Sequence, residues 1–302
     1  MSAVGRRLAL NLMAAEHLGD GTFGAVLEAA RTADHLGVHR VVLPDHVVIS
    51  AQAHREREGF PYPLDASWFE PLTALAAVAA VTERVRLGTN VLIAPLRPAV
   101  LLAKQLASLD AISGGRVEVA LGIGWQEAEY AAAGVAFDRR MSALVEQVRA
   151  CRALWGEPPA GAQPALAGLG DLHSHPRPPQ GDRLPVSLGV GLGPRNVARI
   201  VELGVGWAPA PMPVADFAAG VARLRAACAD AGRDPATLAV TGAVTLPPQH
   251  VRAAEAGLPH PLAEAEALWD AGADTVIVHP LAHCDDLEDL PEFLSPLLAA
   301  AG

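Results

Sequence analysis

Basic residues are few in this chain of 302 residues, which has 23 lysines and arginines against 33 aspartates and glutamates. The formal net charge is −10, and no run of basic residues interrupts the acidic balance. Proteins that bind DNA or RNA need clustered lysine and arginine side chains to neutralise phosphates. A nucleic-acid-binding function is therefore not expected.

Cysteine is also scarce, and Cys151, Cys228 and Cys284 lie far apart along the chain. An odd number of cysteines without C-x-x-C spacing argues against a disulfide framework and against a zinc site. We therefore expect buried free thiols in a reducing compartment. His173 and His175 have the spacing of metal ligands, but no cysteine or pair of carboxylates is near them in the sequence, so no metal site is expected.

We also expect no membrane-spanning or export segment. Its N-terminal stretch, MSAVGRRLALNLMAAEHLGDG, begins with two arginines, but Glu16 and Asp20 interrupt the apolar run too early for either role. We interpret the protein as cytoplasmic. Because 51% of its residues are hydrophobic, the chain can bury a large core, and we expect a single domain over residues 1–302.

What the chain does contain is a regular alternation of short apolar runs with longer amphipathic ones. The short runs predict strands over residues 8–12, 40–43, 85–93, 117–121, 185–190, 205–209, 238–245 and 275–279. The longer runs predict helices over residues 25–36, 71–81, 98–112, 141–155, 196–203, 214–231, 263–271 and 290–300. Eight strands that are each followed by a helix predict an α/β fold, a (β/α)8 TIM barrel.

Two further expectations follow from this pattern. Residues 156–184 are rich in proline and glycine and have no period, which predicts a surface insertion after the fourth helix that could reach over the site. Four large aromatic residues fit helix faces, and we expect them in the core: Trp68, Phe69, Trp155 and Trp269.

In a TIM barrel the chemistry lies where the strands end and the following loops begin. Several of the predicted exits are unusual, and glycines there let backbone N–H groups approach an anion or a flat ring. These exits are Pro44-Asp45-His46, Thr89-Asn90-Val91, Gly122-Ile123-Gly124-Trp125, Gly189-Val190-Gly191-Leu192-Gly193-Pro194-Arg195 and Trp207-Ala208-Pro209.

The exit after the fifth strand predicts a phosphate site. Gly189, Gly191 and Gly193 expose backbone N–H groups just before a helix, and Arg195 adds a positive charge. Because this loop follows the fifth strand and not the first, it argues against a dinucleotide-binding fold.

The segments around these exits resemble the luciferase-like monooxygenase superfamily and are most similar to its coenzyme F420-dependent (deazaflavin-dependent) oxidoreductases. The resemblance rests on LPDHVV around His46, on LGTNVL followed by SGGRVEVALGIGW, and on LVEQVRACRALW. It is dense from about Arg40 to Trp155 and sparser towards the C-terminus. It implies a (β/α)8 barrel, a tricyclic cofactor at the C-terminal ends of the strands, a small-molecule substrate and a homodimer.

The same resemblance implies roles for individual residues. Asp45 and His46 match a pair that faces the reactive carbon of the deazaflavin, and Asn90–Val91 matches a cis peptide bond that bulges under the ring. The backbone beside the ring is matched by Gly122 and Gly124, and the phosphate end by residues 189–193.

Several positions depart from the family pattern, among them the phosphate turn, which is a looser GVGLG here. Ile49-Ser50 stand where the family's sugar-phosphate dehydrogenases have a tryptophan, and Trp125 stands where they have a catalytic glutamate. Oxidation of a sugar phosphate is therefore not expected. Trp125 and His279, which closes the last predicted strand, become candidates for the substrate pocket, although His279 could equally cap the strand.

Together these features predict an F420-dependent oxidoreductase that moves a hydride between the deazaflavin and a small organic substrate. His46 would handle the proton, with Asp45 orienting it or contacting the edge of the ring. A reduced-FMN-dependent monooxygenase of the same superfamily is the alternative. A third possibility is a barrel that binds a flavin-like ligand without turnover.

Overall fold

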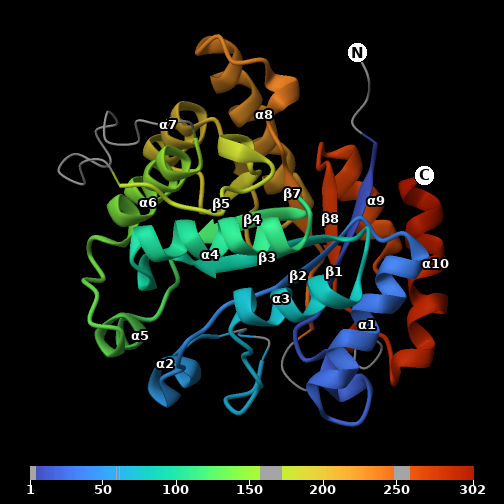
Figure 1. Cartoon of the computed structure of the whole chain (residues 1–302). Coiled ribbons are helices and arrows are strands. Elements are labelled where there is room, and N and C mark those ends of the chain that lie inside the picture. Colours follow the sequence, from blue (N-terminus) through green and yellow to red (C-terminus); the bar gives the residue numbers. More distant parts are fainter. Residues whose placement is uncertain (1–4, 59, 61, 157–171, 248–258) are drawn as a thin grey trace.

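The computed structural model describes residues 5–58, 60, 62–156, 172–247 and 259–302. These residues form a ring of eight parallel strands with helices around it (Figure 1). The predicted (β/α)8 barrel is therefore confirmed. The strands are β1 (Arg7–Asn11), β2 (Arg40–Leu43), β3 (Arg86–Ile93), β4 (Val117–Gly122), β5 (Val186–Gly189), β6 (Gly206–Trp207), β7 (Thr241–Ala243) and β8 (Thr275–Val278).

The strands pair in the order β6-β5-β4-β3-β2-β1-β8-β7. Between β6 and β7 the pairing is reduced to a single parallel bridge between Trp207 and Val240. There the backbone N–H of Trp207 donates to the carbonyl oxygen of Ala239 at 2.9 Å. Because all the strands are parallel, their C-terminal ends meet at one edge of the barrel, and the loops that follow them lie together there.

The long helices agree closely with the predicted ranges. Two short helices, α2 (Ala51–Glu56) and α5 (Glu127–Ala132), were not predicted, because six residues are too few to show a helical period. The others are α1 (Phe23–Leu36), α3 (Pro71–Val81), α4 (Ala99–Ile112), α6 (Arg140–Trp155), α7 (Pro194–Leu203), α8 (Val214–Asp230), α9 (Leu262–Asp270) and α10 (Leu290–Ala301).

The strands divide the core into an outer and an inner part, because successive residues of a strand point to opposite faces. Outward-pointing residues such as Val41 pack beneath the helices. The inner part is small and consists of Ala9, Val42, Ala243 and Ile277. Short side chains inside the barrel leave room for larger groups at its two ends.

Most predictions about buried residues are confirmed. Trp155 and Trp269 are buried on α6 and α9. The three cysteines are buried free thiols. Burial raises the pKa of Cys151 to about 12, so this thiol stays protonated at neutral pH. Among the described helices, none has the length and apolar character needed to cross a membrane.

The described part of the insertion, residues 172–184, lies at the edge of the barrel opposite the strand exits. The amide nitrogen of Gln180 donates to Asp110 Oδ1 and to the carbonyl oxygen of Val117, at the start of β4, at 2.8 Å each. Its oxygen accepts from Arg86, the first residue of β3, at 2.9 Å. The expectation that the insertion reaches over the site is therefore wrong for these residues, whereas residues 157–171 lie outside the described part.

Candidate active site

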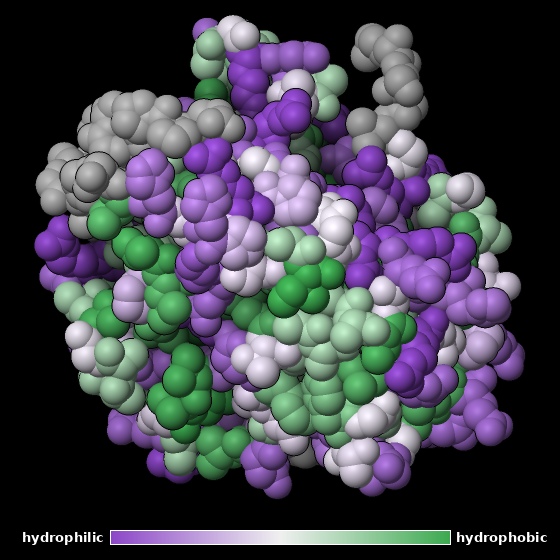
Figure 2. Space-filling view, viewed as in Figure 1, coloured by the Kyte–Doolittle hydropathy of each residue, from purple (hydrophilic) through white to green (hydrophobic). Residues whose placement is uncertain are grey.

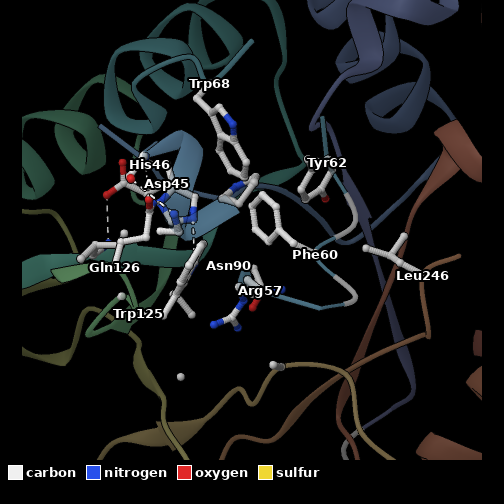
Figure 3. Close-up of a pocket in the computed structure, with 18 of the residues that line it drawn as sticks. Asp45, His46, Arg57, Phe60, Tyr62, Trp68, Asn90, Trp125, Gln126 and Leu246 are labelled. Atoms are coloured by element: carbon white, nitrogen blue, oxygen red, sulfur yellow. Dashed lines mark hydrogen bonds between the residues drawn. The ribbon is translucent and has the colours of Figure 1, made fainter. Parts of the chain in front are cut away.

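A cavity of about 1180 Å³ opens at the C-terminal edge of the barrel (Figure 3). Predicted site residues reach it from five strand ends. They are His46 after β2, Asn90 in β3, Trp125 after β4, Gly189 at the end of β5 and His279 after β8. The fold thus brings together residues that are far apart in the sequence.

His46 is held through both nitrogens of its imidazole ring, and it is 8% exposed. Nδ1 lies 3.0 Å from Glu129 Oε2 and 3.2 Å from the side-chain nitrogen of Gln126, which also donates to Glu129 Oε2 at 3.4 Å. Nε2 accepts a hydrogen bond from the indole N–H of Trp125 at 3.2 Å. Because an indole N–H can only donate, we assign the proton of the neutral imidazole to Nδ1, where it points at Glu129. The lone pair that could take a proton is therefore that of Nε2, and in this structure it accepts from Trp125.

Glu129 on α5 was not predicted as a site residue. It is 1% exposed, and its Oε1 accepts the backbone N–H of Val47 at 2.7 Å, next to the contact with His46. The carboxylate therefore fixes both the backbone after β2 and the orientation of the imidazole. Its position four residues after Trp125, which follows a predicted strand, was its signal in the sequence.

Asp45 does not orient His46, contrary to one of the predicted roles. Its carboxylate accepts a hydrogen bond from the backbone N–H of Ile93 at 2.9 Å. It also accepts hydrogen bonds from both terminal nitrogens of Arg97, at 2.6 and 3.2 Å. The side chain is 1% exposed. Because these bonds occupy the carboxylate, Asp45 ties the exit of β2 to the end of β3, and Glu129 is the carboxylate that contacts His46.

The peptide bond between Asn90 and Val91 is cis, as the resemblance implied. The register of β3 against β4 shifts at Val91, so this residue bulges. A Cβ added to Gly122 would lie 2.4 Å from Val91, and one added to Gly189 would lie 2.3 Å from it. Gly122 was expected beside the cofactor ring, but in the structure it makes room for Val91. Gly189 also makes room for Val91, and in addition it lines the cavity.

One wall of the cavity comes from the segment between α2 and α3, which was not predicted to contribute. Phe60, Tyr62 and Trp68 project from this segment (Figure 3). The ring centroids of Trp68 and Phe60 lie 4.7 and 5.9 Å from that of His46. Trp68 was expected on a helix face in the core, but it precedes α3 and lines the cavity.

Composition held a signal for this wall. Residues 60–69 include two of the six phenylalanines, one of the two tyrosines and one of the five tryptophans, in a chain with only 4% aromatic residues.

The ionisable groups around the cavity differ in charge. Burial, together with the nearby His283, lowers the pKa of His279 from 6.5 to about 3, so this imidazole is neutral at working pH. Burial also raises the pKa of Tyr62, although a hydrogen bond to Asn11 acts in the opposite direction. The guanidinium of Arg57 lies over the ring of Trp125, 4.3 Å from its centroid.

The rest of the glycine-rich loop after β5 lies outside the cavity lining. Gly191, Gly193 and Arg195 are exposed, and Gly193 is the N-cap of α7. The side-chain amide of Asn196 donates to the carbonyl oxygen of Gly191 at 2.8 Å, which fixes the loop. The loop starts at the cavity through Gly189 and ends at a helix N-terminus, so its role as the phosphate end stays a prediction.

Comparisons with known proteins give the family. The family model for luciferase-like monooxygenases matches residues 8–271. An uncharacterised protein of Mycobacterium tuberculosis is 34% identical over 211 residues, 68% of this chain and 74% of that protein. The pyrimidine monooxygenase RutA of Cronobacter sakazakii is 31% identical over 170 residues, 55% of this chain and 50% of RutA.

A solved structure of an F420-dependent secondary alcohol dehydrogenase, in complex with an F420-acetone adduct, has the same fold. It matches with a TM-score of 0.76 at 16% identity and covers 99% of each chain. Identity this low supports the fold alone, whereas the family model spans most of the sequence. The chain belongs to the luciferase-like monooxygenase family.

Proposed function

We propose that this protein is an oxidoreductase that exchanges a hydride between bound coenzyme F420 and a small organic substrate. The observation that carries the proposal is His46, an imidazole oriented by Glu129 at the wall of a cavity of about 1180 Å³. Small-molecule and cofactor sites measure roughly 300–1,000 Å³. The cavity therefore has room for a tricyclic ring with a small molecule beside it.

The residues at the strand ends fit such a cofactor. Val91 is displaced into the space that Gly122 and Gly189 leave free, which gives the cavity an apolar floor. Asn90, Val91 and Gly189 would hold the ring, and residues 191–195 would hold the phosphate end at the N-terminus of α7. When bound, the deazaflavin supplies a carbon that accepts and returns hydride.

The proton would be handled by His46. Nε2 would take a proton from the substrate or return it, while Glu129 stabilises the positive charge that the imidazole then carries. Asp45, held by Arg97, keeps the segment after β2 in place. Phe60 and Trp68 exclude water from one side of the imidazole.

A reduced-FMN-dependent monooxygenase is the second candidate, and the likeness to RutA favours it. FMN also carries a phosphate, which the loop from Gly189 to Arg195 could bind in the same way. A barrel that binds a flavin-like ligand without turnover is the third. These candidates differ in cofactor preference and in turnover.

Equilibrium titration by fluorescence quenching tests the proposal. We expect F420 to bind at least about tenfold more tightly than FMN, a difference of about 1.4 kcal/mol. Tighter binding of FMN would favour the monooxygenase, and binding of neither would refute the proposal. Tight binding of F420 without hydride exchange over a substrate panel would favour the third candidate.

The variant Gly189→Leu tests whether the cofactor ring lies beside Val91. Its side chain would collide with Val91 and press it towards the space of the ring, so F420 affinity should fall about tenfold or more. Gly5→Leu is the control, because no atom lies within 4 Å of a Cβ added there. Circular dichroism of both variants checks that each is folded.

We also propose that the protein forms a homodimer and works in the cytoplasm. Figure 2 shows apolar residues gathered on the face where α3 and α4 lie. On α4, Val100, Leu101 and Ile112 are 46%, 48% and 61% exposed. Light scattering after size exclusion should give twice the 31.3 kDa of one chain, and a monomer would contradict the dimer.

A further inference from the structure

Arg57 places a positive charge at the large cavity. It follows α2 directly, lines the cavity and lies over the ring of Trp125, 4.3 Å from its centroid (Figure 3). Contact with the face of a ring uses none of the N–H donors of a guanidinium. Within the described ranges, no oxygen accepts a hydrogen bond from these donors and no carboxylate pairs with them. The donors are therefore available to a ligand.

Arg97, at the same end of the barrel, shows how an arginine is paired when the fold itself uses its charge. Burial opposes the charge of Arg97, but Asp45 and Glu70 outweigh this effect and raise its pKa. Burial alone shifts the pKa of Arg57, and it lowers that pKa. The guanidinium of Arg57 is thus partly withdrawn from water and has no anion to compensate for the loss of solvation. A ligand with a negative charge would supply that compensation.

The acidic residues near Arg57 leave its guanidinium free. Glu56 and Glu58 flank it in the sequence, and Glu56 accepts a hydrogen bond from the side chain of Gln52 at 2.8 Å. Glu127 lines the cavity from the start of α5. All three glutamates are exposed. Because water and salt screen exposed charges, these carboxylates repel an anion on Arg57 only weakly.

Contacts between α2 and the loop after β4 fix the position of Arg57. The side-chain oxygen of Gln126 accepts the backbone N–H of Ser50 at 2.9 Å, and its nitrogen donates to the carbonyl oxygen of Val48 at 3.3 Å. Ser50 in turn caps the first turn of α2. Because Gln126 follows Trp125 directly, these bonds hold the segment that carries the guanidinium against the segment that carries the indole.

We propose that Arg57 binds a carboxylate group of the substrate, so that the protein acts on small organic acids with an apolar body. The planar fork of N–H groups in a guanidinium matches the two oxygens of a carboxylate. Phe60 and Trp125, whose ring centroids lie 5.5 Å apart, give the body of such an acid an apolar surface next to the charge. The inference rests on the proposed function and names its class of substrate.

The test follows the indole N–H signals of the full chain, labelled with ¹⁵N-tryptophan, by NMR spectroscopy with and without F420. The probes are benzoate and benzamide, which are similar in shape and differ in charge. Trp125→Phe assigns the Trp125 signal. Three other indole N–H groups donate to backbone carbonyls and serve as internal references: those of Trp155, Trp207 and Trp269.

We expect benzoate to shift the Trp125 signal saturably and to leave the three references in place. It should bind roughly tenfold more tightly than benzamide, because hydrogen bonds between two charged groups are the stronger ones. In Arg57→Gln this preference should disappear. Arg55→Gln is the matched control: it removes the same charge from an exposed residue of α2 that lies outside the cavity lining, so the preference should persist.

A Trp125 signal that does not respond to benzoate, or equal affinity for benzamide both with and without F420, would overturn the inference. So would a preference that survives in Arg57→Gln or is lost equally in Arg55→Gln. F420 itself carries carboxylates, so its affinity is measured in Arg57→Gln as well. We expect a value within about threefold of the wild type. A tenfold loss would assign the guanidinium to the cofactor and overturn the inference.

The two proposals fail in different ways. The spectra without F420 report on the carboxylate site even if no cofactor binds. A protein that binds F420 but shows no preference for benzoate loses only the role given to Arg57, whereas one that fails to bind F420 loses the proposed function.

Discussion

The two ends of this barrel both bury charged side chains, but they use them in opposite ways. At the N-terminal end, Arg40 lies 3.2 Å from Glu118 Oε2 and donates to Thr241 at 3.0 Å. At the C-terminal end, His46 pairs with Glu129 at the wall of the large cavity. We expect the first pair to stabilise the fold, and we propose that the second pair, beside the cavity, provides a group for chemistry.

Glycine makes room at both ends, and what fills the room differs. A Cβ on Gly88 would lie 2.9 Å from Arg40, so the absence of a side chain there admits the guanidinium stem. A Cβ on Gly189 would lie 2.3 Å from Val91. The N-terminal end of the barrel is thus filled by a charged network, whereas at the C-terminal end an apolar residue, Val91, lines the bottom of the open cavity.

The largest expected effect is on the stability of the protein and comes from the charged network at the N-terminal end of the barrel. Burial opposes the ionisation of Glu118, but the hydrogen bond with His39 and the charges of Arg40 and Arg86 outweigh it and lower its pKa from 4.5 to about 2. This stabilisation is fully present above pH 4.5 and is lost as the pH falls towards 2. Glu118→Gln should lower the free energy of unfolding by about 3 kcal/mol at neutral pH and flatten its acid dependence, as measured by urea denaturation.

Glu28→Gln is the matched control for that variant. Glu28 forms an exposed pair with Arg31 at 3.0 Å, so its loss should change the unfolding free energy by less than about 0.5 kcal/mol. F420 affinity should be the same in both variants and in the wild type. A loss of F420 affinity in Glu118→Gln would show that the two ends do not act separately.

The second largest effect is expected on catalysis and comes from the C-terminal end of the barrel. Glu129→Gln keeps an acceptor for the Nδ1 proton of His46 but removes the charge that stabilises the imidazolium. We expect kcat to fall about tenfold or more, with F420 affinity unchanged. Glu146→Gln, an exposed change on α6, is the control, and an equal loss of kcat in both variants would remove the role given to Glu129.

The smallest effect is expected at His279. Because its pKa is lowered to about 3, the imidazole is neutral and does not titrate over the usual working range of about pH 5 to 8. The pH profile of kcat in His279→Asn should therefore have the same shape as that of the wild type. A limb that disappears in this variant would make His279 a proton-transfer group and weaken the case for His46.

The strands could be predicted because their signals are local, and the cis peptide bond was implied by the resemblance to the family. Short apolar runs buried on both faces identify strands, and the LGTNVL motif identifies the bulge. The partners of the charged groups were not predictable in this way. Glu129 meets His46 across 83 residues and Arg97 meets Asp45 across 52, and these pairings depend on how two strand exits fold against each other.

Single-turnover kinetics of His46→Gln test whether His46 exchanges the substrate proton at the C-terminal end of the barrel. Reduction of bound F420 by a small organic substrate that the wild-type protein converts would be followed by absorbance. We expect a rate at least about 100-fold lower than in the wild type, with F420 affinity within about threefold. An unchanged rate, or a loss of F420 binding without a separate loss in the chemical step, would contradict this role of His46.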